Sequence, residues 1–377
     1  MWLTALCALL LLLLLQPQTH GKRYKVATGP DADKAAETYR RLKPCLRYDR
    51  EYVLKYPWDA EDHYSELLKR TDQYRNQPVH RGSANYNGTW IEDQFIARFL
   101  TMPLSHFSGL FPLFVQWSDY GFAARARGLT QAQAFEPLRA FLRPDVLYVT
   151  VSQANNGLEF LHIGDPNVIV LSAGGDGNIP IPLIKGTLPY SPPPESFSVQ
   201  MGFYGSPEHG PRGKIIAEMD SAAKAEVPSW VYFVGPHKHW KEQMGVTTFN
   251  LAPRGFGRAS FRLAEIIQLG RIPVYLYDDA PWAPYERSPF GVEHVGYQGQ
   301  LGRLAALVRH LKAQSNATVF DKLARVAAAR RYYTLDGTLD QIDLFLRDPL
   351  GPAGGHLTCR KHAFITHGKA SVLDINL

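Results

Sequence analysis

The sequence of 377 residues lacks clustered charge, repeats and cysteine-rich segments. Its 41 lysines and arginines against 35 aspartates and glutamates give a net charge of +6, but no basic run of the kind that follows a phosphate backbone is present. Solenoid-type repeats and low-complexity tracts are also absent, and no Cys/His cluster has the spacing of a metal site. With 45% hydrophobic and 20% charged residues, the chain reads as a mildly basic globular protein that does not bind nucleic acid.

One segment alone is apolar enough to enter a membrane, and it lies at the N-terminus. Residues 3–15 carry no charge and are about 13 residues long, short of the ~20 that a spanning helix needs. We therefore interpret residues 1–21 as a signal peptide or a short signal anchor. The rest is expected in the lumen of the secretory pathway, in the Golgi or ER. Asn87 and Asn316 lie in Asn-x-Thr sequons, which fits that location.

Two cysteines remain once Cys7 is assigned to the targeting segment. Cys45 and Cys359 lie near opposite ends of the mature chain. In an oxidising lumen they would form a disulfide. Two buried free thiols fit the sequence equally well, so both interpretations stay open here.

Short apolar runs alternate with segments of helical composition, the pattern of parallel strands covered on both faces. The expected fold class is therefore α/β. The expected strands are residues 110–117, 145–152, 167–172, 230–234, 246–251 and 272–277, and the expected helices are residues 34–42, 60–74, 91–99, 131–141, 260–269, 298–313 and 319–331.

A proline-rich stretch, residues 180–194, separates two sets of strands. This spacing predicts two Rossmann-like domains that face a central cleft. We expect an N-terminal domain over residues 22–225, a C-terminal domain over residues 226–345, and a tail, residues 346–377, that packs back on the first domain.

The strongest functional signal is the segment 249–265. A strand ends there in a Gly-x-Gly turn before a helix, and such a helix N-terminus favours phosphate. The segment also contains Arg262 and Glu265, which lie one turn apart and can face one ligand. The expected donor-binding residues are Arg254, Gly255, Arg258, Ser260 as the helix cap, Arg262, Glu265 and, from the loop near Gly235, Lys238.

Three linked elements of this region resemble the exostosin family of glycosyltransferases. They are the Pro-x-Gly turn at residues 253–255, the Ser-x-Arg-x-x-Glu helix start at residues 260–265, and Gly-Arg-Ile-Pro-Val at residues 270–274. The resemblance extends over residues 86–345. Phe256 departs from the family, where arginine often follows the turn.

The resemblance implies a GT-B-type architecture and an inverting transfer of a sugar from a nucleotide-sugar donor, usually a UDP-sugar, to a glycan or polysaccharide acceptor. The first domain would then serve the acceptor and the second the donor. Arg262 would contact the diphosphate, Glu265 the ribose, and Gly255 the close backbone turn. No cofactor or divalent metal is implied.

Inverting transfer needs a base near the acceptor hydroxyl. Asp119 follows the expected strand 110–117 and is the candidate, with a simple turn residue as the alternative; Glu92 and His106 are less well placed. A second functional hypothesis is a catalytically inactive exostosin-like partner or carbohydrate-binding subunit, in a homo- or heterodimer. The intact Arg262 and Glu265 favour the enzyme.

Overall fold

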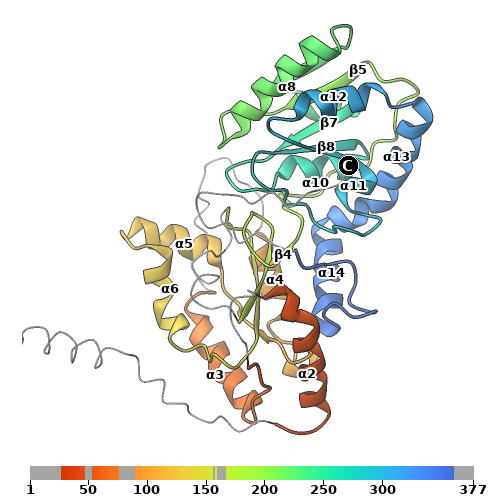
Figure 1. Cartoon of the computed structure of the whole chain (residues 1–377). Helices are drawn as coiled ribbons and strands as arrows, with labels where there is room; N and C mark the ends of the chain where they lie inside the picture. The colour runs from red at the N-terminus through yellow and green to blue at the C-terminus, as the bar shows by residue number, and fades with distance from the viewer. Residues whose placement is uncertain (1–26, 47–52, 76–89, 156–157, 159–166, 361–377) are drawn as a thin grey trace, which may run out of the picture.

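A computed structural model shows two parallel α/β units stacked end to end, and it describes residues 27–46, 53–75, 90–155, 158 and 167–360 (Figure 1). Each unit contains one parallel sheet with helices on its faces. The expected α/β, GT-B-like class with two Rossmann-like sheets is therefore confirmed. Within the described residues, no helix combines the length and the apolar character that crossing a bilayer requires.

The first sheet has the strand order β1-β2-β3-β4. Its two longer strands are buried along their whole length, because Val, Ile, Leu and Tyr side chains point to both covered faces. Tyr148 pairs with Val168 and Ser152 with Ser172, so the two strands run in parallel register. The elements of this unit are α2 (Pro30–Leu42), α3 (Ala60–Asp72), α4 (Ile91–Phe99), β1 (Phe111–Pro112), α5 (Trp117–Ala126), α6 (Gln131–Arg139), β2 (Tyr148–Ser152), β3 (Val168–Ser172) and β4 (Ile179–Pro180).

The second sheet has the strand order β6-β5-β7-β8-β9, and all neighbouring pairs are parallel. Its central strands β7 and β8 are buried throughout. The elements are β5 (Val199–Tyr204), α8 (Arg212–Glu226), β6 (Tyr232–Gly235), α9 (Trp240–Gly245), β7 (Thr247–Pro253), α10 (Phe261–Leu269), β8 (Ile272–Tyr277), α11 (Val292–Val295), β9 (Tyr297–Gln300), α12 (Leu304–Lys312) and α13 (Asn316–Ala329).

This strand order contains a topological switch point. From β5 the chain passes through α8 to β6 on one side, whereas from β7 it passes through α10 to β8 on the other. In open parallel sheets, ligands bind in the crevice outside the carboxyl ends of the two strands that flank such a point. The fold alone therefore predicts a ligand site at the carboxyl ends of β5 and β7.

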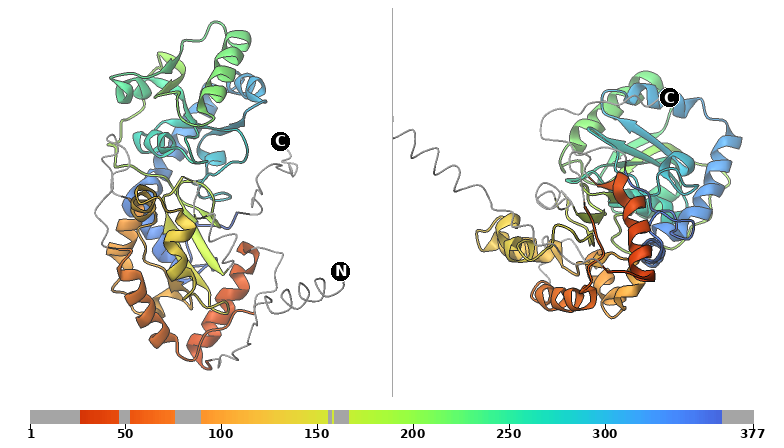
Figure 2. Two further views of the ribbon diagram at one scale, coloured as in Figure 1. Left: turned by 90° about the vertical axis from the view of Figure 1, so that its left-hand side faces the viewer. Right: turned by 60° about the horizontal axis from the view of Figure 1, so that its bottom comes forward.

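The last helix returns to the first unit. Helix α14 (Leu335–Arg347) lies against α4, and Asp348 just beyond it pairs with Arg41 of α2 at 2.6 Å (Figure 1; Figure 2 gives two further views). Farther along, Cys359 forms a disulfide with Cys45, with their Cα atoms 5.3 Å apart. Of the tail, Asp348 and Cys359 thus contact the N-terminal unit, whereas His356 and Thr358 contact residues 286–290 of the second.

The units divide earlier than expected. Strand β5 belongs to the second sheet and helix α8 to the same unit, so the connection falls within residues 181–198 and not between residues 225 and 226.

Two other expectations, both about secondary structure, need correction. The run 110–117 gives a two-residue strand, because helix α5 begins at Trp117. The run 298–313 contains strand β9 before helix α12 starts at Leu304.

Candidate anion-binding site

Two helices start at the switch point, each after a loop that contains glycine. The loop of residues 205–211 joins β5 to α8, and the loop of residues 254–260 joins β7 to α10. The N-termini of α8 and α10 carry unpaired backbone N–H groups and the positive ends of the helix dipoles. A single arginine projects into this region from the first turn of each helix: Arg212 from α8 and Arg262 from α10.

Arg212 is anchored by carbonyl groups. Its Nε donates to Arg254 O and its Nη1 to Ser206 O, both at 3.1 Å, and its guanidinium lies 5.5 Å from the Phe203 ring centroid. Within the described residues it makes no ion pair. A guanidinium that is buried and held without a carboxylate keeps its full positive charge available to an anion.

Arg262 is held from several elements at once. Its Nη2 donates to Tyr204 O at 2.7 Å, and its Nη1 contacts Met244 Sδ at 3.3 Å. Its ion pair with Glu265 is 2.9 Å long, and each of the two side chains is only 16% exposed. The Trp240 ring centroid lies 4.3 Å from the guanidinium carbon. Arg262 and Glu265 thus pair with each other one turn apart on α10.

Burial and mutual repulsion make the positive charges of Arg212 and Arg262 energetically unfavourable. Burial, together with the positive charge of Arg262, lowers the pKa of Arg212 to about 10. Burial also lowers the pKa of Arg262, although the neighbouring Glu265 opposes that change. Two partly buried cations with one ion pair, that of Arg262 with Glu265, leave a net positive charge, which a bound anion would neutralise.

Small residues let the arginines approach the backbone. A methyl group at Gly255 would lie 3.4 Å from Nη2 of Arg212, and one at Gly205 would lie 3.6 Å from Nη2 of Arg262. Gly210 has a φ of +56°, and a side chain there would come within 2.8 Å of Gly255 O. The two loops therefore touch, with Gly255 beside Arg212 and Gly205 beside Arg262.

Arg254 and Arg258 are placed differently from the expectation, because aspartates neutralise them. Nη1 of Arg254 pairs with Asp278 at 2.7 Å and with Asp279 at 2.9 Å. Nε of Arg258 pairs with Asp279 at 2.7 Å, and its Nη1 pairs with Asp176. Asp176 comes from the first unit, so Arg258 ties the units together. Because these ion pairs occupy both guanidinium groups, neither arginine is expected to contact a phosphate directly.

The same loop packs against the first unit through its backbone. Ala259 N donates to Gly174 O at 3.2 Å, and a methyl group at Gly257 would collide with Gly174 O at 2.1 Å. Glycine at 257 is therefore required by the contact between the units, and not by a ligand. The loop that holds Gly174 follows β3, so the carboxyl ends of β3 and β7 face each other.

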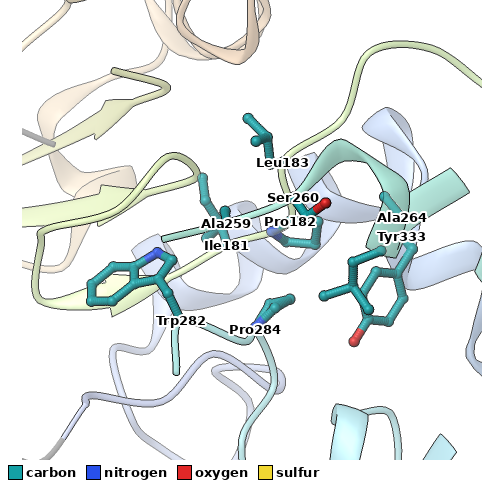
Figure 3. A pocket seen from close by; sticks show the side chains of 10 residues that line it. Ile181, Pro182, Leu183, Ala259, Ser260, Ala264, Trp282, Pro284 and Tyr333 are labelled. Carbon is teal, nitrogen blue, oxygen red and sulfur yellow. The ribbon is translucent and has the colours of Figure 1, made fainter. Parts of the chain in front are cut away.

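Ser260 is the N-cap residue of α10 but makes no capping hydrogen bond with its side chain. Its buried hydroxyl instead lines a small pocket beneath the connection between the units, where Trp282 and Tyr333 also lie (Figure 3). The pocket encloses about 220 Å³ of atom-free space, open solvent included. Ser260, Leu263 and Ala264 point to it from one face of α10, while Arg262 and Glu265 lie on the opposite face. The pocket is therefore separate from the anion site.

Asp119 lies in the first turn of α5 and is fully buried, because the strand expected before it ends at Pro112. It is neither in a strand-end loop nor a turn residue, and its Oδ1 accepts from Trp90 Nε1 at 3.0 Å. Glu92 is buried beside it and accepts from Ser118 N and Gln153 N, each at 2.8 Å. Burial outweighs these hydrogen bonds and raises the pKa of Glu92 to about 8. These carboxyl groups join α4 and α5 to the end of β2.

The other expected residues lie outside the site. His106 pairs with Asp343 of α14 at 2.9 Å, and Lys238 is exposed in the loop between β6 and α9. Asn316 is exposed at the start of α13, whereas Asn87 lies outside the described residues. In the part of the chain that the structure describes, no group of three or more His, Cys, Asp or Glu side chains could hold a metal ion.

Arg212 is the residue that the sequence analysis missed. Its signal was present: a strand-like run at residues 199–204 followed by a loop with Gly205 and Gly210 and then a helix. This is the same strand, glycine loop and helix order that identified residues 249–265. The nearby proline-rich stretch concealed it, because the whole region reads as a linker.

No protein-family model and no curated protein sequence matches the chain. Among solved structures, it is similar to one of a GtfA/B complex, with 12% identity and a TM-score of 0.36 over 53% of this chain and 46% of that chain. It is similar to one of TarM, with 13% identity and a TM-score of 0.32 over 57% and 53%. A third is an alpha-glucosyltransferase in complex with UDP-glucose and DNA containing an abasic site, with 9% identity and a TM-score of 0.29 over 57% and 76%.

The match thus spans about half the length of the first two of these chains. A likeness at this level assigns no reaction, donor or acceptor to this chain. What the site can bind follows from its own geometry. Two guanidinium groups, of which Arg262 alone has an ion pair among the described residues, lie with two helix N-termini and close-packed glycines at the switch point of a parallel sheet, and they form a place for a phosphate or diphosphate.

Proposed function

We propose that this chain is a glycosyltransferase that holds the diphosphate of a nucleotide sugar between Arg212 and Arg262. The observation that carries the proposal is the pair of partly buried guanidinium groups at the switch point between β5 and β7, of which only that of Arg262 has an ion pair, with Glu265, among the described residues. Glu265 is partly exposed, so it is also available to the ribose hydroxyl groups of a nucleotide. The resemblance of residues 253–274 to the exostosin family supports a UDP-sugar as the donor.

The chemistry we propose is inverting transfer to a glycan or polysaccharide acceptor. The acceptor hydroxyl oxygen would bond to the anomeric carbon as the bond to the nucleoside diphosphate breaks, and the hydroxyl proton would pass through water to the departing phosphate. The two arginines with the two helix N-termini would stabilise the negative charge of the leaving group. We leave Asp119 out of this step, because its carboxyl group is fully buried against Trp90 and an acceptor could not reach it.

Location in the secretory lumen, Golgi or ER, is part of the proposal. The Cys45–Cys359 disulfide supports it, since such bonds persist in oxidising compartments. The apolar residues 3–15 and the exposed Asn316 of a sequon also fit an N-glycosylated luminal protein.

A thermal-shift screen of the purified chain against UDP-, GDP- and CMP-sugars tests the donor. A ligand at one hundred times its Kd should stabilise the protein by about 2.7 kcal/mol, provided that it binds only the folded state. UDP-sugars should raise Tm in the wild type and not in Arg262→Ala. If no nucleotide sugar raises Tm at millimolar concentration, the proposed function fails.

One observation favours a second candidate, an inactive partner subunit in a homo- or heterodimer. The carboxyl groups of Glu92 and Asp119 at the edge of the first sheet are both buried, so neither is open to serve as base. Radiolabelled UDP-sugar turnover separates the two functions: an enzyme transfers sugar to a glycan acceptor or hydrolyses the donor, whereas an inactive partner binds UDP and does neither.

A further inference from the structure

Arg262 carries its charge toward Arg212 although the two cations repel each other, since the charge of Arg262 lowers the pKa of Arg212. A long arginine side chain in such a position gains both rotamer freedom and hydration by turning away. Other contacts must therefore hold the Arg262 side chain in place. Three of them are polar contacts, and the fourth is with an aromatic ring.

Tyr204 O, Met244 Sδ and Glu265 meet Arg262 at its nitrogen atoms and so use its N–H groups. The Trp240 indole instead lies over the guanidinium carbon at 4.3 Å from the ring centroid. Stacking fixes the guanidinium plane and uses no N–H group. Trp240 is thus a contact that orients Arg262 and leaves its remaining donors to a ligand.

We propose that Trp240 is a positioning residue of the donor site, which keeps the guanidinium plane of Arg262 turned toward the phosphates beside Arg212. This inference rests on the proposed function, because it assumes that a nucleoside diphosphate binds between the arginines. It assigns to helix α9, which the motifs of residues 253–274 do not include, a role in donor affinity.

The position of Trp240 in the chain fits this role. It is the first residue of α9, between the carboxyl end of β6 and the start of β7, and Met244 of the same helix also contacts Arg262. Helix α9 therefore closes the site on the side of β6, with α8 and α10 on its other sides.

The test compares UDP with uridine, both titrated into the full chain by calorimetry. Losing a desolvated cation–π contact should weaken UDP binding about tenfold in Trp240→Ala, while the Kd for uridine changes less than twofold, because only the phosphates use Arg262. Trp240→Phe keeps an aromatic face and should recover most of the UDP affinity. Trp240→Leu, in which leucine has a volume similar to that of phenylalanine, should not recover the UDP affinity. If Trp240→Ala does not fold, the comparison of Trp240→Phe with Trp240→Leu tests the positioning role.

Trp230→Ala is the matched control. Trp230 stacks on Phe249, 6.0 Å between ring centroids, in the same unit and away from Arg262. The Trp230→Ala variant should have a changed Tm and a Kd for UDP within twofold of that of the wild type. Equal weakening of UDP and uridine in Trp240→Ala, or a Kd for UDP that does not change, would overturn the positioning role. A wild type that binds no nucleoside diphosphate refutes the proposed function itself, which separates the two failures.

Discussion

Four arginines lie around the β7–α10 loop, and they differ in the carboxylates that they contact. Arg254 and Arg258 pair with aspartates, and Arg258 connects the two units through Asp176. Arg212 and Arg262 have one carboxylate between them and lie at the switch point of the second sheet. The residue type is the same in all four, so the partners decide the role.

The difference follows from where each side chain can find a carboxylate. Asp278 and Asp279 follow β8, and Asp176 follows β3 of the first unit, so these aspartates face the seam between the units. The end of β5 supplies backbone carbonyl groups, Tyr204 O to Arg262 and Ser206 O to Arg212. Glu265 is the single carboxylate that pairs with either arginine among the described residues, so a net positive charge remains there for a phosphate.

The largest effect is expected from Arg262→Ala. A charge-assisted contact to phosphate is worth about 2–3 kcal/mol, so kcat/KM for the UDP-sugar should fall about 100-fold. The change also leaves Glu265 without its cation, which adds to the loss. Steady-state kinetics with the best donor of the thermal-shift screen measures this, with circular dichroism as the check on folding. A loss below about threefold would remove Arg262 from the donor site.

Arg212→Ala should weaken UDP binding about 30-fold, somewhat less than Arg262→Ala, because the helix N-terminus and Arg262 remain. Arg212→Lys keeps the charge without the planar fork, so it should recover only part of the affinity. Calorimetric titration with UDP gives the three Kd values. Full recovery by lysine would show that charge alone, without hydrogen-bond geometry, is what the site uses.

Arg258→Ala is the same chemical change made in the other pair of arginines. It removes the ion pairs to Asp176 and Asp279 at the seam, and we expect the free energy of unfolding to fall by about 1–3 kcal/mol, discounted for partial exposure. The Kd for UDP should stay within about threefold. Urea unfolding and UDP titration together provide both numbers. A large loss of UDP affinity without loss of stability would reverse the roles of the two arginine pairs.

Glu92 extends the comparison to the end of β2 in the first sheet, and its effect on stability should be smallest near pH 4.5 and below. Its folded pKa of about 8 lies above the ordinary 4.5, so the folded chain keeps a proton that the unfolded chain loses. Stability should therefore fall as pH rises from about 4.5 to about 8, relative to Glu92→Gln. Unfolding of both proteins at pH 5, 6, 7 and 8 checks this; parallel pH profiles would show that Glu92 is ionised when buried.

Much of the fold was predictable because buried parallel strands and helix caps are local signals. Strand β8 starts and ends where the apolar run 272–277 placed it, and helix α10 follows Ser260 as expected. Strand β5 was missed because it follows a proline-rich connection, and β9 because four residues before a helix carry no periodicity of their own. The early start of α5 at Trp117 is set by Glu92, which accepts from Ser118 N, a contact between distant residues.

The site was predictable in part for the same reason. Arg262, Glu265 and Gly255 follow from one local motif; the structure pairs Arg262 with Glu265 and places Gly255 beside Arg212. Which of the four arginines pair with aspartates could not be predicted. That pairing depends on Asp176 and Asp279, which contact Arg258 only because the strands and the two units pack together. Burial of Asp119 likewise depends on Trp90, 29 residues away in sequence.

The most direct test of the central claim is a crystal structure of the full chain with UDP. The two phosphate groups should lie outside the carboxyl ends of β5 and β7, within hydrogen-bond distance of Arg212 and Arg262, with the ribose beside Glu265. Phosphate density at Arg254 or Arg258, or in the pocket lined by Ser260 and Trp282, would contradict the assignment of the site.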